Sequence, residues 1–199
     1  MPNTLRKPPA RMTVAEFLDW PGDGTGRKCQ LIDGEVRVMS PGSPTHGRLQ
    51  STLARLIGNA LTASGSTWDV ITDPGVAVQE GNKTDVGVPD LGVTGTPDTA
   101  GDRLMPDPVL LIEILSPSNA NETRENVWSY RTIASVQEII VVHSTRILAE
   151  VLRRGPDGQW PEEPEEIGMG GTLSLDSIGF ACPLTDVYAR THLAGEQPS

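Results

Sequence analysis

The pattern of apolar and polar positions along the chain predicts strands that alternate with helices. The most apolar stretch is 109–115, in which Glu113 is the one polar residue, and prolines lie on either side of it. A continuous apolar run of this length is typical of a strand covered on both faces. Residues 138–143 have the same character, and 119–133 predict a helix between the two. We therefore expect the two strands to be parallel and joined by a right-handed crossover.

Other local signals place further elements on either side of this unit. The Thr13–Glu16 capping box predicts a short helix, and Asp33-Gly34 predicts the turn of a β-hairpin over 30–39. A long helix is expected to begin after Ser43 and to end near Gly65, because its apolar residues form one stripe: Leu49, Leu53, Leu56, Ile57 and Leu61. The remaining expectations are strands over 70–79 and 86–93 with a turn at 81–82, a strand over 147–153, an exposed and mobile acidic segment over 161–166, a strand pair within 173–180, and a short helix over 184–189.

This order of elements predicts an α/β fold with a mixed β-sheet flanked by helices. The length of 199 residues suits one domain. We place that domain at 12–190, with a loose N-terminal arm over 1–11 and a C-terminal tail over 191–199.

Composition excludes some classes of protein. No window approaches 18 uninterrupted apolar residues, and no apolar segment follows the basic residues near the N-terminus, so we expect neither a membrane span nor a secretory signal. The two cysteines, Cys29 and Cys182, lie far apart and show no zinc-binding spacing with the histidines. We expect a cytoplasmic protein with reduced thiols.

The net charge of −10 weakens the case for a nucleic-acid partner. The acidic residues are unevenly distributed, however: 155–199 hold eight acidic residues and one basic residue, which leaves −3 for the first 154 residues. The charge argues against tight non-specific DNA binding, but it is compatible with a local basic groove.

Two isolated acids carry the candidate chemistry. Glu113 lies in the central apolar stretch, and Asp90 lies in the apolar stretch 86–93. An ionised carboxylate in an apolar strand must be neutralised, paired or bound to a cation. Two such acids on neighbouring strands predict a divalent-metal site. The alternatives are a structural ion pair or capped acid for Glu113, and a turn or edge position for Asp90 after Pro89.

Three stretches in this order resemble a known family. They are Leu31-Ile32-Asp33-Gly34-Glu35 followed by Met39-Ser40-Pro41 and His46; Pro89-Asp90-Leu91; and 112–118, Ile-Glu-Ile-Leu-Ser-Pro-Ser. Over roughly 12–190 the chain resembles the Uma-type family of restriction-endonuclease-like proteins, a branch of the PD-(D/E)XK nuclease superfamily. The resemblance implies a restriction-endonuclease-like core, in which a helix, three strands of a mixed sheet, a second helix and a further strand follow one another.

The resemblance also implies a site. Asp90 matches the aspartate of the motif and Glu113 its second acid, and these two, with the backbone carbonyl of Ile114, would bind Mg²⁺ or Mn²⁺. Glu35, His46 and Asn126 join the candidate catalytic residues. Glu35 could instead be a surface residue and His46 a polar helix cap. The lysine of the motif is absent, because its position holds Leu115 and the substitute position four residues before Tyr130 holds Asn126.

Two functions follow from this reading. The first is a Mg²⁺-dependent endonuclease that hydrolyses DNA phosphodiester bonds by attack of a metal-bound water. The second is a catalytically inactive nuclease-fold protein that serves as a binding or regulatory module, since neither lysine position is filled. We expect a homodimer, with the helix of Trp128 and Tyr130 or the C-terminal strands as the interface.

Overall fold

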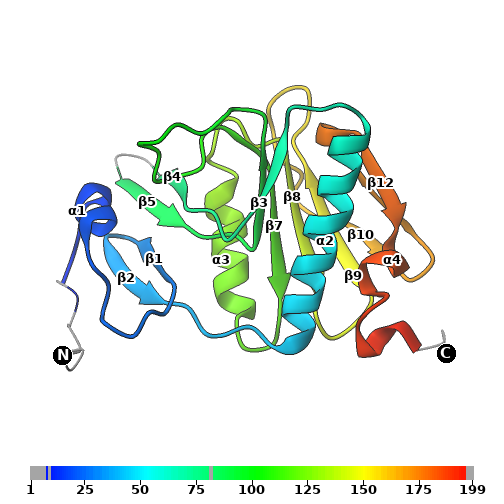
Figure 1. Cartoon of the computed structure of the whole chain (residues 1–199), viewed down its shortest axis with the longest axis horizontal. Helices are drawn as coiled ribbons and strands as arrows, with labels where there is room; N and C mark the ends of the chain where they lie inside the picture. The colour runs from blue at the N-terminus through cyan, green and yellow to red at the C-terminus, as the bar shows by residue number, and fades with distance from the viewer. Residues whose placement is uncertain (1–7, 9, 81–82, 196–199) are drawn as a thin grey trace.

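Two β-sheets form the framework of the protein (Figure 1). The computed structural model describes residues 8, 10–80 and 83–195, apart from the side chains of 80, 83 and 84. The larger sheet has the strand order β10-β9-β8-β7-β6-β3. Its strands are β3 (Asp69–Thr72), β6 (Leu91–Thr94), β7 (Pro108–Leu115), β8 (Glu138–His143), β9 (Leu148–Arg153) and β10 (Glu165–Gly168).

The central strands confirm the expected topology. β7 lies between β6, to which it is antiparallel, and β8, to which it is parallel. The connection from β7 to β8 runs through helix α3 (Ala120–Tyr130), as the sequence predicts. The fold is therefore α/β with a mixed sheet.

The smaller sheet has the order β2-β1-β5-β4. Its strands are β1 (Cys29–Ile32), β2 (Glu35–Val38), β4 (Val76–Glu80) and β5 (Lys83–Gly87). β1 and β2 form the predicted hairpin, and its two turn residues, Asp33 and Gly34, have positive φ angles of 53° and 74°. This backbone favours the Asp-Gly pair found there. Helix α1 (Val14–Asp19) precedes the hairpin and begins with the predicted capping box.

Helices cover both faces of the larger sheet. Helix α2 (Pro44–Ala63) packs its predicted apolar stripe on one face, together with α4 (Leu184–Tyr188) and the pair β11 (Thr172–Leu175) and β12 (Phe180–Pro183). Helix α3 packs on the other face, between β7 and β4. Among the described residues, no helix is long and apolar enough to cross a membrane.

The alternation of side chains along β7 determines where Glu113 lies. Leu110, Ile112 and Ile114 belong to the core beneath α2, whereas Leu111 belongs to the core beneath α3. Successive residues of a strand face opposite sides. Glu113 therefore lies on the α3 side.

Two of the predicted strands were wrong in extent. The stretch 86–93 is two strands in different sheets, since Val86 pairs with Ala77 in the smaller sheet and Leu91 pairs with Ile112 in the larger one. Pro89 lies in the break, where its lack of an N–H group does not interrupt a ladder. The stretch 70–79 is likewise divided between β3 and β4, with Asp73 at a φ of 50° in the turn.

The predictions for the C-terminal part were correct in type but not always in extent. The segment 161–166, expected to be exposed and mobile, is mostly exposed, and its last two residues begin edge strand β10, which pairs with β9 and buries Ile167. A 3₁₀ turn, η1 (Asp176–Ile178), separates the predicted strand pair β11–β12. A second one, η2 (His192–Gly195), lies beyond residue 190 and buries Leu193. The turn expected at 81–82 and most of the arm over 1–11 lie outside the described residues, as does 196–199.

Candidate active site

Asp90 lies where the chain passes from the smaller sheet to the larger one. Its Oδ2 accepts a hydrogen bond of 2.6 Å from the backbone N–H of Ile114, and its Oδ1 is 2.7 Å from Nε2 of His46. The residue is 7% exposed. The carboxylate is thus held from two sides, by the central strand and by helix α2.

His46 reaches Asp90 from the first turn of α2. Ser43 caps this helix through its side chain, which accepts a hydrogen bond of 3.2 Å from the backbone N–H of His46, and Pro44 occupies the first turn. The backbone of His46 is therefore capped by another residue, which leaves its imidazole for Asp90. This geometry supports a site role over that of a polar cap.

Glu113 is buried on the α3 side of β7. Its Oε1 accepts hydrogen bonds from Nδ2 of Asn126 at 3.1 Å and from the hydroxyl of Tyr130 at 2.9 Å. Asn126 and Tyr130 are four residues apart, so they lie on one face of α3. Gly87 of β5 makes room for the Tyr130 ring, because a Cβ at this glycine would lie 2.7 Å from Cε1 of Tyr130.

Burial, and after it the negative charge of Asp90, raise the pKa of Glu113 to about 8. The hydrogen bonds from Tyr130 and Asn126 act in the opposite direction but do not compensate. The pKa of Tyr130 is raised by its own burial and by the charge of Glu113. At neutral pH Glu113 is therefore predominantly protonated, and a cation beside the two acids would favour its ionised form.

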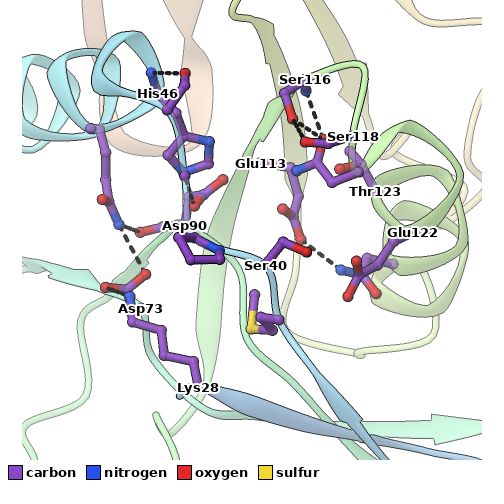
Figure 2. Close-up of a pocket in the computed structure, with 18 of the residues that line it drawn as sticks. Lys28, Ser40, His46, Asp73, Asp90, Glu113, Ser116, Ser118, Glu122 and Thr123 are labelled. Carbon is purple, nitrogen blue, oxygen red and sulfur yellow. Dashed lines mark hydrogen bonds and ion pairs between the residues drawn. The ribbon is translucent and has the colours of Figure 1, made fainter. Parts of the chain in front are cut away.

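Asp90 and Glu113 line one cavity of about 310 Å³, together with His46 and Asn126 (Figure 2). Figure 2 shows both carboxyl groups directed toward the same hollow, one from the side of α2 and one from the side of α3. The structure thus brings together four of the five candidate catalytic residues. Glu35, the fifth, is exposed at the start of β2 and does not line this cavity.

The carbonyl of Ile114 already has a partner. It accepts a hydrogen bond of 3.2 Å from Nδ2 of Asn119, whose Oδ1 accepts from the backbone N–H of Ser116 at 2.7 Å. Asn119 also lines the cavity. A cation at this carbonyl would compete with the amide of Asn119.

The cavity contains charged residues that the sequence analysis did not select. Lys28, just before β1, forms an ion pair with Asp73, and both residues line the cavity. Nε2 of Gln50 donates to Oδ1 of Asp73 at 3.0 Å and to the backbone carbonyl of Asp90 at 2.9 Å. In sequence, Lys28 follows a glycine-rich loop and Asp73 precedes Pro74-Gly75, so both positions resemble ordinary turns.

A third acid, Glu122 in the first turn of α3, borders the cavity. Its Oε1 accepts a hydrogen bond of 2.5 Å from Nε2 of the buried Gln30, and partial burial raises its pKa. Arg124, two residues further along α3, is instead bound to Glu150 and does not line the cavity. Arg124 therefore does not supply a positive charge to the two acids.

The donor set fits a hard divalent cation. Two carboxyl groups and a backbone carbonyl are oxygen ligands, and Mg²⁺ keeps several waters of its own in such sites. Asp90 and Glu113 line the same cavity, and the charge of Asp90 raises the pKa of Glu113. Within the described part of the chain, no group of three or more His, Cys, Asp or Glu side chains is placed to bind a metal together. An ion at Asp90 and Glu113 would therefore need the backbone carbonyl and water as its further ligands.

Comparisons with known proteins agree with the fold. The model of the Uma2 family, described as "Putative restriction endonuclease", matches residues 14–185. A protein from Anabaena variabilis ATCC 29413, whose crystal structure is described as that of "a putative nuclease belonging to DUF820", superposes with a TM-score of 0.69. It is 18% identical in sequence, and the match covers 89% of this chain and 98% of that one. No curated protein matches the chain.

Proposed function

Because this chain belongs to the Uma2 family, we propose that it is an endonuclease that hydrolyses phosphodiester bonds of DNA with the help of Mg²⁺ or Mn²⁺. Asp90, Glu113 and the carbonyl of Ile114 would hold the ion. The single observation that carries the proposal is that Asp90 and Glu113, which are far apart in sequence, line one cavity. Membership in the Uma2 family and the similarity to the solved structure support a nuclease-like function. The metal and the DNA substrate are our proposal.

The reaction needs one water molecule. Its oxygen forms a bond to phosphorus, the bond from phosphorus to the leaving oxygen breaks, and a proton reaches that oxygen. A bound divalent ion would supply positive charge for the phosphate and acidify water. The protein residues have separate tasks: His46 and the N–H of Ile114 orient Asp90, whereas Asn126 and Tyr130 hold one oxygen of Glu113. Such preorganisation is what this chemistry requires of the protein.

The charges around the cavity bear on a nucleic-acid substrate. Its lining holds two cations, Arg27 and Lys28, and four acids, Asp73, Asp90, Glu113 and Glu122. The acidic residues over 155–195, which carry much of the net charge of −10, do not line it. A bound divalent ion would offset part of the acidic charge of the lining before a phosphate enters.

A specific observation favours a second candidate function. Leu115 and Asn126 occupy the two positions where the family resemblance implies a lysine. In addition, the side-chain amide of Asn119 donates a hydrogen bond to the carbonyl of Ile114. A protein with these features could bind nucleic acid or a partner without cleaving it. The fold would be the same in both cases.

Incubation of the purified protein with supercoiled plasmid in Mg²⁺ or Mn²⁺ separates the two functions. We expect nicking by the wild type and at least a hundredfold slower nicking by Asp90→Asn and Glu113→Gln. Glu163→Gln, which changes an exposed acid remote from the cavity, is the matched control and keeps the wild-type rate. A wild type that binds the ion without nicking would leave the binding module as the function.

We also propose that the protein is a homodimer. Of the two aromatic residues expected at an interface, Tyr130 is fully buried and contacts Glu113, so it is excluded. Trp128 is 69% exposed, and the guanidinium of Arg131 lies 4.6 Å from its ring centroid. Trp128 is the residue of α3 that a partner could cover.

A further inference from the structure

We propose that Lys28 supplies the positive charge that neither usual lysine position provides. This inference rests on the proposed function and assigns a catalytic residue within it. Lys28 is distant in sequence from both acids, and it reaches their cavity because the smaller sheet packs beside the larger one. Figure 2 shows its side chain extending to Asp73, which lies below Asp90 in this view.

A chain of contacts connects Lys28 to Asp90. The ammonium group is paired with Oδ2 of Asp73. The backbone N–H of Asp73 donates to the carbonyl of Asp90 at 3.0 Å, and Nε2 of Gln50 bridges the Asp73 carboxylate and the same carbonyl. In the absence of a substrate, the ammonium group of Lys28 is thus held beside Asp90 through Asp73.

The conformation of Asp73 is part of this arrangement. Its φ of 50° is uncommon for a residue other than glycine, and Asp and Asn tolerate it best. The turn that requires this φ places the Asp73 carboxylate between Gln50 and Lys28. Strained positions of this kind are retained where surrounding contacts determine them, and they are frequent at functional sites.

Other basic residues near the site are occupied elsewhere. Arg27 lines the cavity, but its guanidinium donates to Asp23 at 3.1 Å and to Oγ1 of Thr25 at 3.0 Å, within its own loop. Arg124 is held by Glu150 outside the cavity. Of the arginines and lysines whose side chains are described, Lys28 is the one whose acidic partner itself lines the cavity.

The exposure of the Lys28–Asp73 pair allows the ammonium to turn toward a substrate. The Lys28 side chain is 56% exposed and that of Asp73 28%. Ion pairs at this exposure are weak. A phosphate entering the cavity would therefore attract the ammonium group, which would contact a non-bridging oxygen and stabilise the charge that develops during attack.

The test compares nicking by the wild type, Lys28→Met, Lys28→Arg and Arg103→Gln. Arg103 is the matched control, since it is an exposed cation paired with Asp19 and does not line the cavity. We expect kcat to fall about a hundredfold in Lys28→Met, because the variant lacks the donor that would stabilise the charge developing on the phosphate oxygen. Lys28→Arg should recover at least a tenth of the wild-type rate, and Arg103→Gln should keep the wild-type rate.

DNA binding measured by fluorescence anisotropy in EDTA gives the second readout. We expect the Kd of Lys28→Met to stay within threefold of the wild type, because a residue that acts on the developing charge affects kcat more than binding. A Lys28→Met protein that nicks at the wild-type rate, or whose loss lies entirely in Kd, overturns this inference and leaves the proposed function standing. A wild type that does not nick overturns the proposed function, and this inference with it.

Discussion

The hydroxyl of Tyr130 donates a hydrogen bond of 2.9 Å to Oε1 of Glu113, and both residues are buried. This contact joins helix α3 to the central strand β7 at Glu113, whose pKa is raised to about 8 by its surroundings. It also explains why Tyr130 is fully buried although it lies in a mostly polar helix. Removal of the hydroxyl should therefore change both stability and the ionisation of Glu113.

Tyr130→Phe should lower the free energy of unfolding by about 1 kcal/mol, the usual contribution of one buried hydrogen bond. It should also move the pH midpoint of divalent-ion binding upward, because the hydroxyl lowers the pKa of Glu113. Tyr188→Phe is the matched control, since its hydroxyl donates to the carbonyl of His143 at 2.6 Å, away from the cavity. Chemical denaturation and calorimetry measure the two effects. An equal pH midpoint in both variants would contradict this account of Tyr130.

Divalent-ion binding should depend steeply on pH. Glu113 has a pKa of about 8 in the folded protein without metal, so below pH 8 a proton competes with the ion for this carboxylate. We expect the apparent affinity for Mn²⁺ to fall up to about tenfold per pH unit from 8 to 6, and to level off above 8. Titrations at several pH values check this. Affinity that does not vary with pH would show that Glu113 is not a ligand.

Stability should decrease as the pH rises. The pKa of Glu113 is about 8 in the folded protein against 4.5 as its ordinary value, so between these values the unfolded chain releases a proton that the folded chain keeps. Unfolding is therefore increasingly favoured from pH 4.5 to 8, by an amount on the order of a few kcal/mol in total. Thermal unfolding in EDTA over this range should show a falling Tm.

Glu113→Gln provides the control for that measurement. The amide cannot ionise, so the variant should lose this part of the pH dependence and exceed the wild type in stability at pH 9. A wild type and a variant with parallel Tm curves would mean that Glu113 ionises as readily in the folded state as in the unfolded one.

Asn126→Lys should raise the rate of nicking. A lysine at this position would place an ammonium group beside Oε1 of Glu113, where Nδ2 of Asn126 now donates at 3.1 Å. It would lower the pKa of Glu113 and add positive charge for the phosphate. We expect the rate of plasmid nicking at pH 7 to increase about tenfold. Asn126→Leu, which adds no charge, should nick more slowly than Asn126→Lys. Equal rates for the lysine and leucine variants would contradict the assignment of this position.

Trp128→Ser should shift the protein toward the monomer. Loss of a large exposed aromatic residue removes apolar area from an interface, and such residues contribute strongly to association. Sedimentation velocity over a range of concentrations should show a dimer for the wild type and a weaker one for the variant. A wild type that sediments as a monomer at every concentration would exclude the dimer.

The elements that carry the site could be predicted because their signals are local. The apolar run of β7 indicates a buried strand, the stripe of α2 indicates one packed face, and Tyr130 and Asn126 lie four residues apart on α3. The division of 86–93 could not be predicted, because the residues on both sides of Pro89 are apolar and only the pairing partners separate β5 from β6.

The basic part of the site was missed for a different reason. Lys28 meets Asp73 only when the two sheets pack against each other, and neither residue lies in a pattern that distinguishes it from a turn. Glu35 shows the opposite case: it follows a clear hairpin signal and belongs to the resembling motif, yet the strand direction leaves its side chain exposed outside the cavity. Contacts between distant segments, rather than local pattern, determine which polar residues share a cavity.

The central claim is that Asp90 and Glu113 together bind one divalent ion. Isothermal titration of Mn²⁺ at pH 8.5 into the wild type, Asp90→Asn, Glu113→Gln and Glu163→Gln tests it most directly. We predict one ion per chain for the wild type and for Glu163→Gln, and at least a tenfold weaker affinity for each of the two site variants. Undiminished binding in Asp90→Asn and Glu113→Gln, or no binding by the wild type, would contradict it.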